Sequence, residues 1–293
     1  MPRFLALADH EPGRVRRVKK LLLAAASVIV LAGCAAAPAE TPQVLFIDVG
    51  KGDAVLVMAE GRRYLVDAGP KDAWPRVEAA LWQYGVTALD GVFLTHGDKD
   101  HSGGLKSLAA SGIPVAAWYA SDLDADDGEK EHPAAAAAAL QGQQAVYLSA
   151  GTAAGPFTAL APLKRDKDDD SNSLVLMLSS SGSRALLTGD MKFDEEEDLI
   201  NSGRSLDCDL IKIAHHGGSD ATSQALIDAA TPIVAVVSTD SDERPELPDP
   251  RIVAMLEERG IPLYSTWRSG GGVMVTLSGA DTRAEAVEIP GAS

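Results

Sequence analysis

The sequence predicts a layered α/β domain in which two β-sheets pack together between outer helices. Strand pairs come first, strand–helix alternation follows, and this order occurs twice along the chain. The 293 residues are 46% hydrophobic, which is enough to fill the core of one large domain. A mean hydropathy of +0.00 argues against a protein with several membrane spans. Since no tandem repeat or internal linker interrupts the pattern, we predict a single domain over residues 43–293.

Alternating strands and helices are predicted for the first half of this domain. Short apolar runs between glycine-containing turns predict strands, and apolar residues at helical spacing predict helices. The expected strands are 43–48, 54–59, 63–67, 91–95, 115–119, 145–148 and 157–161. The expected helices are 73–84, 105–110 and the alanine-rich 133–141. The acidic segment 122–131 is expected to be a loop.

The second half repeats the order. Two strands around Ser-Gly-Ser predict a hairpin, which a charged turn at 165–170 precedes. The expected strands are 174–178, 184–187, 210–214, 233–238, 263–266 and 273–277. The expected helices are 195–201, 223–230 and 251–259.

The first 33 residues are predicted to be an export signal. A basic segment, 14–20, precedes an apolar segment, 21–32, that is too short to span a bilayer comfortably. The apolar segment ends in Leu-Ala-Gly-Cys34, which resembles a bacterial lipobox. This resemblance implies cleavage before Cys34 and acylation of its thiol, and Ala35 implies outer-membrane sorting in a Gram-negative cell. An ordinary signal peptide or an uncleaved anchor is the alternative. The Ala/Pro-rich stretch 34–42 is expected to be a flexible tether.

The charge balance is strongly acidic, at −16 for the whole chain. The first 33 residues carry six basic and two acidic side chains, so the remainder carries −20. Nucleic-acid binders neutralise phosphates with Lys and Arg, so general nucleic-acid binding is disfavoured unless a groove is locally basic. Acidity also keeps an exported protein soluble. With only two cysteines, a disulfide framework is excluded.

Ligand-type residues follow the predicted strand 91–95. His96, Asp98, Asp100 and His101 lie within six residues and precede a glycine pair. A loop can fold such residues around an ion, and mixed histidine and carboxylate donors suit Zn²⁺ or Mn²⁺. A polar surface turn is the alternative interpretation.

Two further apolar strands end in the same kind of residue. Asp190 follows Leu-Leu-Thr-Gly, where it could bridge two metals or merely cap the next helix. His215 and His216 follow the strand 210–214, with two glycines after them. Four of the six histidines therefore lie in these loops, whereas His10 lies in the leader and His132 stands alone beside a proline. This concentration predicts one shared metal site with one or two ions.

Six motifs in this order resemble the metallo-β-lactamase-like hydrolase domain of the ComEC competence family, over about residues 43–280. They are Asp48-Val-Gly-Lys-Gly-Asp53, Val66-Asp67-Ala-Gly-Pro70, the His96–His101 run, Ser171-Asn172-Ser173-Leu174-Val175, Leu187-Thr-Gly-Asp190 and Ala214-His-His-Gly217. The resemblance implies the four-layer αββα fold, with a metal site at one edge of the β-sandwich. It also implies a metal-dependent nuclease, here as a free-standing lipoprotein without the membrane channel.

When each family motif is matched to this sequence, the resemblance assigns the metal ligands to individual residues. The implied ligands are His96, Asp98, Asp100, His101, Asp190 and His215. Asp100 would also orient the attacking water, and Asp190 would bridge the ions. The residues implied to support the site or touch substrate are Asp48, Lys51, Asp53, Asn172, His216 and Ser219.

The chain departs from the family pattern at several positions. Asp98 stands where many relatives have a histidine, and Asn172 lies near the position of another. Lys51 stands where the family usually has glutamine, and a Gly-His-Pro element is replaced around Leu247. The residues at positions 98 and 172 predict a carboxylate-rich site. The missing histidine near Leu247 implies a changed substrate or reduced phosphodiester hydrolysis.

Three functional interpretations follow. The first is hydrolysis of phosphodiester bonds in DNA or nucleotides outside the cytoplasm, with a divalent ion activating water. The second is a metallohydrolase of another ester, an amide or a lactam. The third is a non-catalytic lipoprotein with a degraded metal site. Membrane attachment is expected only through the lipid on Cys34.

Overall fold

A computed structural model describes residues 40–125, 132–165 and 172–290. The chain divides into two units, residues 1–37 and 38–293, and all described residues belong to the second. Cys34 and the predicted signal segment lie outside the described residues, as does most of the acidic segment 122–131. None of the helices in the described ranges is long and apolar enough to cross a membrane.

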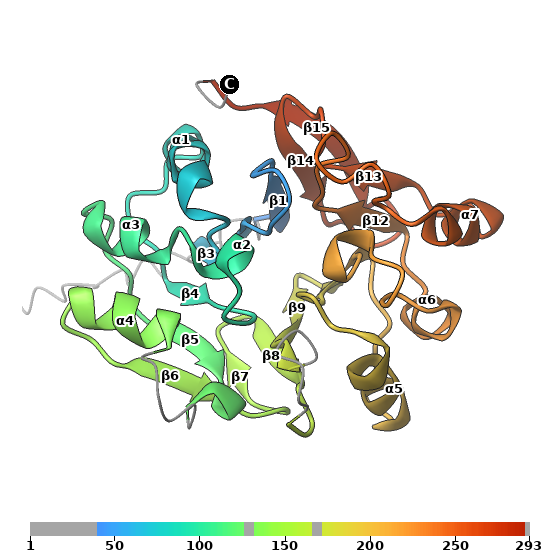
Figure 1. Cartoon of the computed structure of the whole chain (residues 1–293), viewed down its shortest axis with the longest axis horizontal. Coiled ribbons are helices and arrows are strands. Elements are labelled where there is room, and N and C mark those ends of the chain that lie inside the picture. The colour runs from blue at the N-terminus through green and yellow to red at the C-terminus, as the bar shows by residue number, and fades with distance from the viewer. Residues whose placement is uncertain (1–39, 126–131, 166–171, 291–293) are drawn as a thin grey trace, which may run out of the picture. The chain divides into compact units, whose positions relative to one another are not determined.

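Two mixed β-sheets form the centre of the described unit (Figure 1). The first has the strand order β15-β14-β1-β2-β3-β4-β5-β6, and the second β13-β12-β11-β10-β9-β8-β7. The strands of the first sheet are β1 (Gln43–Ile47), β2 (Val55–Ala59), β3 (Arg62–Val66), β4 (Gly91–Phe93), β5 (Trp118–Ser121), β6 (Ala145–Leu148), β14 (Gly271–Thr276) and β15 (Arg283–Glu288). The strands of the second are β7 (Ala153–Ala154), β8 (Phe157–Ala161), β9 (Val175–Ser180), β10 (Ser183–Leu187), β11 (Leu210–Lys212), β12 (Val234–Val237) and β13 (Leu263–Ser265).

Helices cover the outer face of each sheet (Figure 1). Those near the first sheet are α1 (Trp74–Gln83), α2 (Lys99–Ser102), α3 (Leu105–Ala110) and α4 (Pro133–Leu140). Those near the second are α5 (Phe193–Asn201), α6 (Gln224–Ala230) and α7 (Pro250–Glu258). Single-turn 3-10 segments lie at Lys71–Ala73, Asp122–Asp124 and His215–Gly217.

Three apolar clusters separate the four layers. On β1, Leu45 and Ile47 pack with the outer helices α1 and α3, whereas Val44 and Phe46 pack between the two sheets. On β11, Leu210 points between the sheets and Ile211 packs against α5–α7. Because neighbouring side chains on a strand alternate in direction, β1 and β11 each contribute to two of the three clusters. This arrangement confirms the predicted αββα fold.

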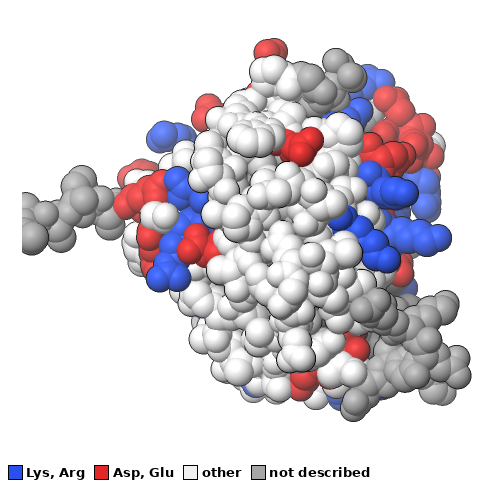
Figure 2. Space-filling view, turned by 90° about the vertical axis from the view of Figure 1, so that its left-hand side faces the viewer, with Lys and Arg blue, Asp and Glu red and all other residues white. Residues whose placement is uncertain are grey.

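The surface charge is unevenly distributed. Figure 2 shows the side on which α4 and β6 lie in Figure 1, and its centre carries few charged side chains. The sequence of α4, Pro-Ala-Ala-Ala-Ala-Ala-Ala-Leu, contributes none. The acidity therefore gathers elsewhere on the described unit.

The end of the predicted tether packs on the domain. Glu40 accepts a hydrogen bond from the backbone N–H of Gly61 at 3.0 Å and forms an ion pair with Arg63 at 3.2 Å. Glu40, three residues before β1, is thus held against the loop between β2 and β3.

Candidate metal centre

Polar residues that follow parallel strands of both sheets lie at one edge of the sandwich. β3 and β4 are parallel in the first sheet, and β10, β11 and β12 are parallel in the second. Asp67 follows β3, His101 lies on α2 beyond β4, Asp190 follows β10 and His216 follows β11. Carboxyl ends of parallel strands share an edge, so residues distant in the sequence meet here.

Two histidine rings face each other across a buried carboxylate. His101 Nε2 lies 3.3 Å from His216 Nε2. Asp190 Oδ2 lies 3.3 Å from the first nitrogen and 3.1 Å from the second. Asp100 Oδ2 lies 3.4 Å from His216 Nε2. Both histidines are fully buried, and Asp190 is 3% exposed.

The opposite nitrogen of each ring is fixed by a partner. His101 Nδ1 lies 2.8 Å from Asp67 Oδ2, and His216 Nδ1 lies 2.9 Å from the carbonyl oxygen of Ser238. Asp67 is itself held by Thr95, which donates from its backbone N–H at 2.8 Å and its hydroxyl at 2.7 Å. Metal-binding histidines usually donate their second N–H to a carboxylate or a carbonyl in this manner. Both Nε2 atoms are therefore oriented as ligands.

The donor set fits a divalent ion. Donors about 2.0–2.1 Å from an ion at the centre of a tetrahedron lie about 3.3–3.4 Å from one another. His101 Nε2, His216 Nε2 and Asp190 Oδ2 lie 3.1–3.3 Å from one another, close to this spacing, and Asp100 Oδ2 lies 3.4 Å from His216 Nε2.

Asp53 is a second candidate for the fourth donor. Asp53, His101, Asp190 and His216 each offer a ligand atom within 4.8 Å of the others. However, Asp53 Oδ2 lies only 2.6 Å from Lys212 Nζ, and it approaches His101 at Nδ1, at 3.7 Å, rather than at Nε2. Asp53 therefore lies on the Nδ1 side of the His101 ring, and the shared core of the donor set is His101, His216 and Asp190.

The buried charges shift one another's pKa values. Burial raises the pKa of Asp190, but His216 and His101 lower it, and the result is well below the usual range. Burial lowers the pKa of His101, but Asp190 and Asp67 raise it well above its ordinary value. The pKa of His216 is also raised: burial lowers it, but Asp190 and Asp100 outweigh this effect. Such perturbed groups are typical of functional sites.

Sequence reasoning missed Lys212, the last residue of β11. It lies on the same face of β11 as Leu210, so its side chain enters the space between the sheets, where it is 2% exposed. Burial lowers the pKa of Lys212, but Asp53 and Asp190 raise it above its ordinary value, so the ammonium stays charged. A lysine inside the apolar run 210–213 was the signal that could have found it.

Glycines allow the loops to approach closely. A Cβ on Gly52 would lie 2.4 Å from the carbonyl oxygen of Asp100, and one on Gly104 would lie 2.2 Å from that of Ala68. The backbone N–H groups of Asp53 and Ala68 donate to Asp100 and His101, respectively. Gly52 and Gly104 therefore allow α2 and the residue after it to lie against the loops after β1 and β3.

The residues predicted for a further ion lie nearby but outside this donor set. His96 is buried, with Nδ1 3.1 Å from Thr95 Oγ1 and its ring 4.2 Å from that of His101. Asn172 is buried, whereas Asp98 is exposed at the start of α2.

The two adjacent histidines have different surroundings. The resemblance assigns His215 as the ligand and His216 as its neighbour, but the structure places His216 in the donor set. Both residues have positive φ angles, 47° and 53°, so the chain turns sharply and directs the two rings apart. His215 lies outside the donor set, with Nδ1 2.7 Å from Asp220 Oδ1.

The donor set borders a recess of about 410 Å³ on the surface. It is lined by Lys51, His215, Gly218, Ser219, Asp220, Arg244, Glu246, Leu247 and Asp249. Lys51 forms an ion pair with Asp100 and thereby connects the recess to the donors. Leu247, at the position of the missing Gly-His-Pro element, lines the same recess. Asp48 lies farther away and lines another recess, with Arg76 and Trp267.

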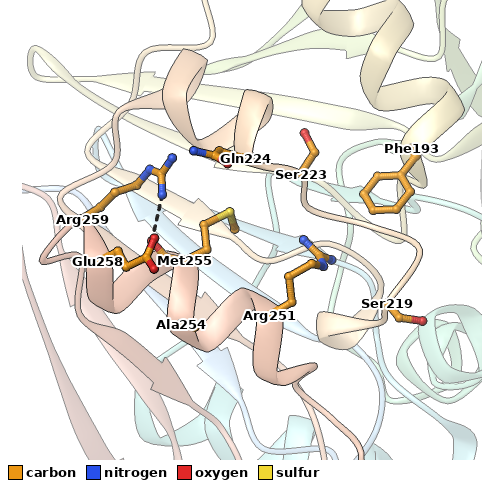
Figure 3. Close-up of a pocket in the computed structure, with 9 residues that line it drawn as sticks. All are labelled: Phe193, Ser219, Ser223, Gln224, Arg251, Ala254, Met255, Glu258 and Arg259. Carbon is orange, nitrogen blue, oxygen red and sulfur yellow. Dashed lines mark hydrogen bonds between the residues drawn. The ribbon is translucent and has the colours of Figure 1, made fainter.

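Ser219 also borders a second recess, of about 590 Å³, between α6 and α7 (Figure 3). Phe193 and Arg251 lie at its wall, with the guanidinium carbon 5.6 Å from the ring centre. Arg251 is fixed by hydrogen bonds to the carbonyls of Thr222 and Ala221, both at 2.8 Å. Ser219 is the lining residue that the two recesses share.

Comparison with known proteins agrees with this geometry. The chain is 25% identical over 255 residues to ComE operon protein 3 of Bacillus subtilis, which covers 78% of the chain and 32% of the relative. It is 29% identical over 252 residues to competence protein ComA of Neisseria gonorrhoeae, covering 83% and 34%, respectively. The chain thus spans about a third of the length of these relatives.

A solved structure and a family profile confirm the fold. Tm1679, described as a metal-dependent hydrolase of the beta-lactamase superfamily, superposes with a TM-score of 0.53 at 14% identity, covering 80% of this chain and 98% of that one. The profile of the Metallo-beta-lactamase superfamily matches residues 47–241, more than half of the chain. The chain therefore belongs to the metallo-beta-lactamase superfamily.

Proposed function

We propose that this protein is a metal-dependent hydrolase that cleaves phosphodiester bonds of DNA or nucleotides outside the cytoplasm. The observation that carries the proposal is the convergence of His101 Nε2, His216 Nε2 and Asp190 Oδ2 within 3.3 Å of one another. Fixed imidazole and carboxylate donors with this spacing fit Zn²⁺ or Mn²⁺. A divalent ion held there would lower the pKa of water to near ~7 and neutralise charge on the substrate.

The side chains around the donors are placed to orient water and to contact the substrate. Burial raises the pKa of Asp100, but His216, His101 and Lys51 hold it well below the usual range, so Asp100 remains a hydrogen-bond acceptor that can orient water. Lys51 lies at the boundary of donors and recess, where its ammonium can approach a phosphate oxygen. Arg244 and Ser219 line the same recess and offer further donors. The phosphate is therefore expected between Lys51 and Ser219.

The competence proteins support a nucleic-acid substrate. One relative is named competence protein ComA, another ComE operon protein 3, and a third that is 27% identical is named recombination protein 2. Because the chain covers about a third or less of each, activity on DNA is proposed for the shared domain alone.

The acidic lining of the recess favours a second candidate. Asp220, Glu246 and Asp249 face the same space as Lys51 and Arg244. Carboxylates repel a polyanion, so a metallohydrolase of an uncharged ester, amide or lactam is the alternative.

Hydrolysis assays on the full chain test the proposal. After loading with Zn²⁺ or Mn²⁺, the protein is incubated with linear DNA, bis-p-nitrophenyl phosphate and a lactam. We expect cleavage of the two phosphodiesters, loss in the Asp100→Ala and His101→Ala variants, and no loss in the exposed control Asp281→Ala. Turnover of the lactam alone would select the second candidate. Phosphodiester turnover that Asp100→Ala and His101→Ala leave unchanged would refute the assigned site.

We further propose attachment to the cell envelope through a lipid on Cys34, with 34–42 as the tether, and at the outer membrane in a Gram-negative host. The support is the basic, apolar and small-residue order of the leader. Incorporation of labelled palmitate and membrane fractionation test it. We expect Cys34→Ala to abolish labelling, and labelling that persists in this variant would exclude the site.

A further inference from the structure

Lys212 lies on the opposite side of Asp190 from the two histidine rings. Asp190 Oδ2 faces His101 and His216, whereas Asp190 Oδ1 lies 3.8 Å from Lys212 Nζ. The same ammonium lies 2.6 Å from Asp53 Oδ2. One carboxylate therefore lies between the proposed ion position and a permanent cation.

The ammonium is held in this position by the backbone. Lys212 Nζ donates to the carbonyl oxygens of Gly189, at 2.8 Å, and Ile213, at 3.3 Å. The Lys212 carbonyl accepts from Thr188 Oγ1 at 2.9 Å. With 2% exposure, the side chain has no route to solvent and is a fixed part of the site.

The net charge of the side chains in contact with the donor set is balanced by one divalent ion. Four carboxylates belong to this contact network, and two ammonium groups oppose them. The carboxylates are those of Asp53, Asp67, Asp100 and Asp190, and the ammonium groups are those of Lys51 and Lys212. With neutral histidines the net charge of this network is −2, which one divalent ion cancels. A second ion would leave a buried excess of positive charge, which is costly in a low-dielectric interior.

We propose that Lys212 supplies the charge of a second cation, so that the site binds one divalent ion per chain. The inference rests on the metal site of the proposed function. Lys212 is a positioning residue: it holds Asp53 and Asp190 in place and limits the ion count. Among the residues predicted for another ion, His96 is buried beside His101, but Asn172 is uncharged and Asp98 is exposed, so this set adds no buried carboxylate.

A charge series tests the proposal without reference to activity. The metal-free full chain is titrated with Zn²⁺ or Mn²⁺, with the ion count measured by elemental analysis and the Kd by calorimetry. The site charge is −3 in Lys212→Met, −2 in the wild type and in Lys212→Met/Asp53→Asn, and −1 in Asp53→Asn. We expect the wild type to bind one ion. Lys212→Met should either bind its first ion about tenfold or more tightly than the wild type or bind a second ion. Asp53→Asn should bind the ion more weakly than the wild type.

The double variant separates charge from structure. Lys212→Met leaves Asp53 as an unpaired buried charge and can fail to fold, but Lys212→Met/Asp53→Asn removes both charges together. We expect the double variant to bind one ion within a few-fold of the wild-type affinity. The control Lys106→Met makes the same substitution at an exposed position of α3 and should change nothing.

Each outcome is decisive. Two ions in the wild type, or affinities that do not follow the site charge, would overturn the role of Lys212 and leave the proposed hydrolase intact. A wild-type protein that binds no divalent ion would overturn both.

Discussion

His101 Nδ1 lies 2.8 Å from Asp67 Oδ2, and this contact turns the opposite ring nitrogen toward His216. Asp67 has a φ of 57° directly after β3, which brings its carboxylate back toward Thr95 and His101. The backbone shape of one loop thereby fixes the tautomer and direction of a histidine 34 residues later. A ring held in this way needs no reorganisation to bind an ion.

Removing this orienting carboxylate should weaken metal binding while leaving the donors in place. We expect Asp67→Asn to raise the Kd for Zn²⁺ or Mn²⁺ by about 10- to 100-fold, the usual effect of losing such a partner. Calorimetric titration measures it, with exposed Asp281→Asn as the control. An unchanged Kd in a folded Asp67→Asn variant would show that Asp67 has only a structural role.

The pH dependence of stability should differ between the metal-free and metal-loaded protein. The pKa values of His101 and His216 are raised in the fold, so their pairing with carboxylates stabilises it fully below about pH 6.5 and is lost as pH rises through the raised values. An ion competes with the same protons, so its affinity rises with pH. Thermal unfolding between pH 6 and 9 should show a gap between loaded and metal-free Tm that widens with pH. A gap independent of pH, or one equally wide in His101→Ala, would contradict this coupling.

The fold was predictable where buried strands show a recognisable pattern of apolar residues in the sequence. The runs 145–148 and 157–161 coincide with β6 and β8, and 105–110 with α3. β15 was missed because Arg283–Glu288 is mostly exposed and presents no apolar side to recognise. The four-residue helix α2 was missed because its length is set by packing against neighbouring loops, not by a periodic pattern.

The candidate site was predictable only as far as strand ends reveal it. His101 and Asp190 follow apolar strands, and the fold necessarily brings such ends together. Which of His215 and His216 enters the donor set depends on two positive φ angles, which cannot be predicted from the residue pattern. The partner of Lys212 lies 159 positions earlier, in Asp53, and only the packing of one sheet on the other reveals that pair.

The free cysteine of the described domain should be inert. Burial raises the pKa of the Cys208 thiol to about 12, and its side chain lies beneath α5 and α6 with 5% exposure. At pH 8 the thiolate fraction is then about 10⁻⁴, so a thiol reagent has almost nothing to attack. In a Cys34→Ala background we expect Cys208 to be labelled only after unfolding in denaturant. Rapid labelling of the native protein would mean that the second sheet opens near β11.

The sharpest test of the site compares the two adjacent histidines. His216 Nε2 lies 3.1 Å from Asp190 Oδ2 and 3.3 Å from His101 Nε2, whereas His215 pairs with Asp220 at the recess. We therefore expect His216→Ala to abolish stoichiometric metal binding and hydrolysis together, since it removes one donor of a compact set. His215→Ala should keep the ion, with any loss confined to substrate turnover. Elemental analysis and DNA or bis-p-nitrophenyl phosphate hydrolysis on both variants decide the matter. Loss of the ion in His215→Ala and its retention in His216→Ala would restore the assignment that the sequence resemblance implied and refute the geometry described above.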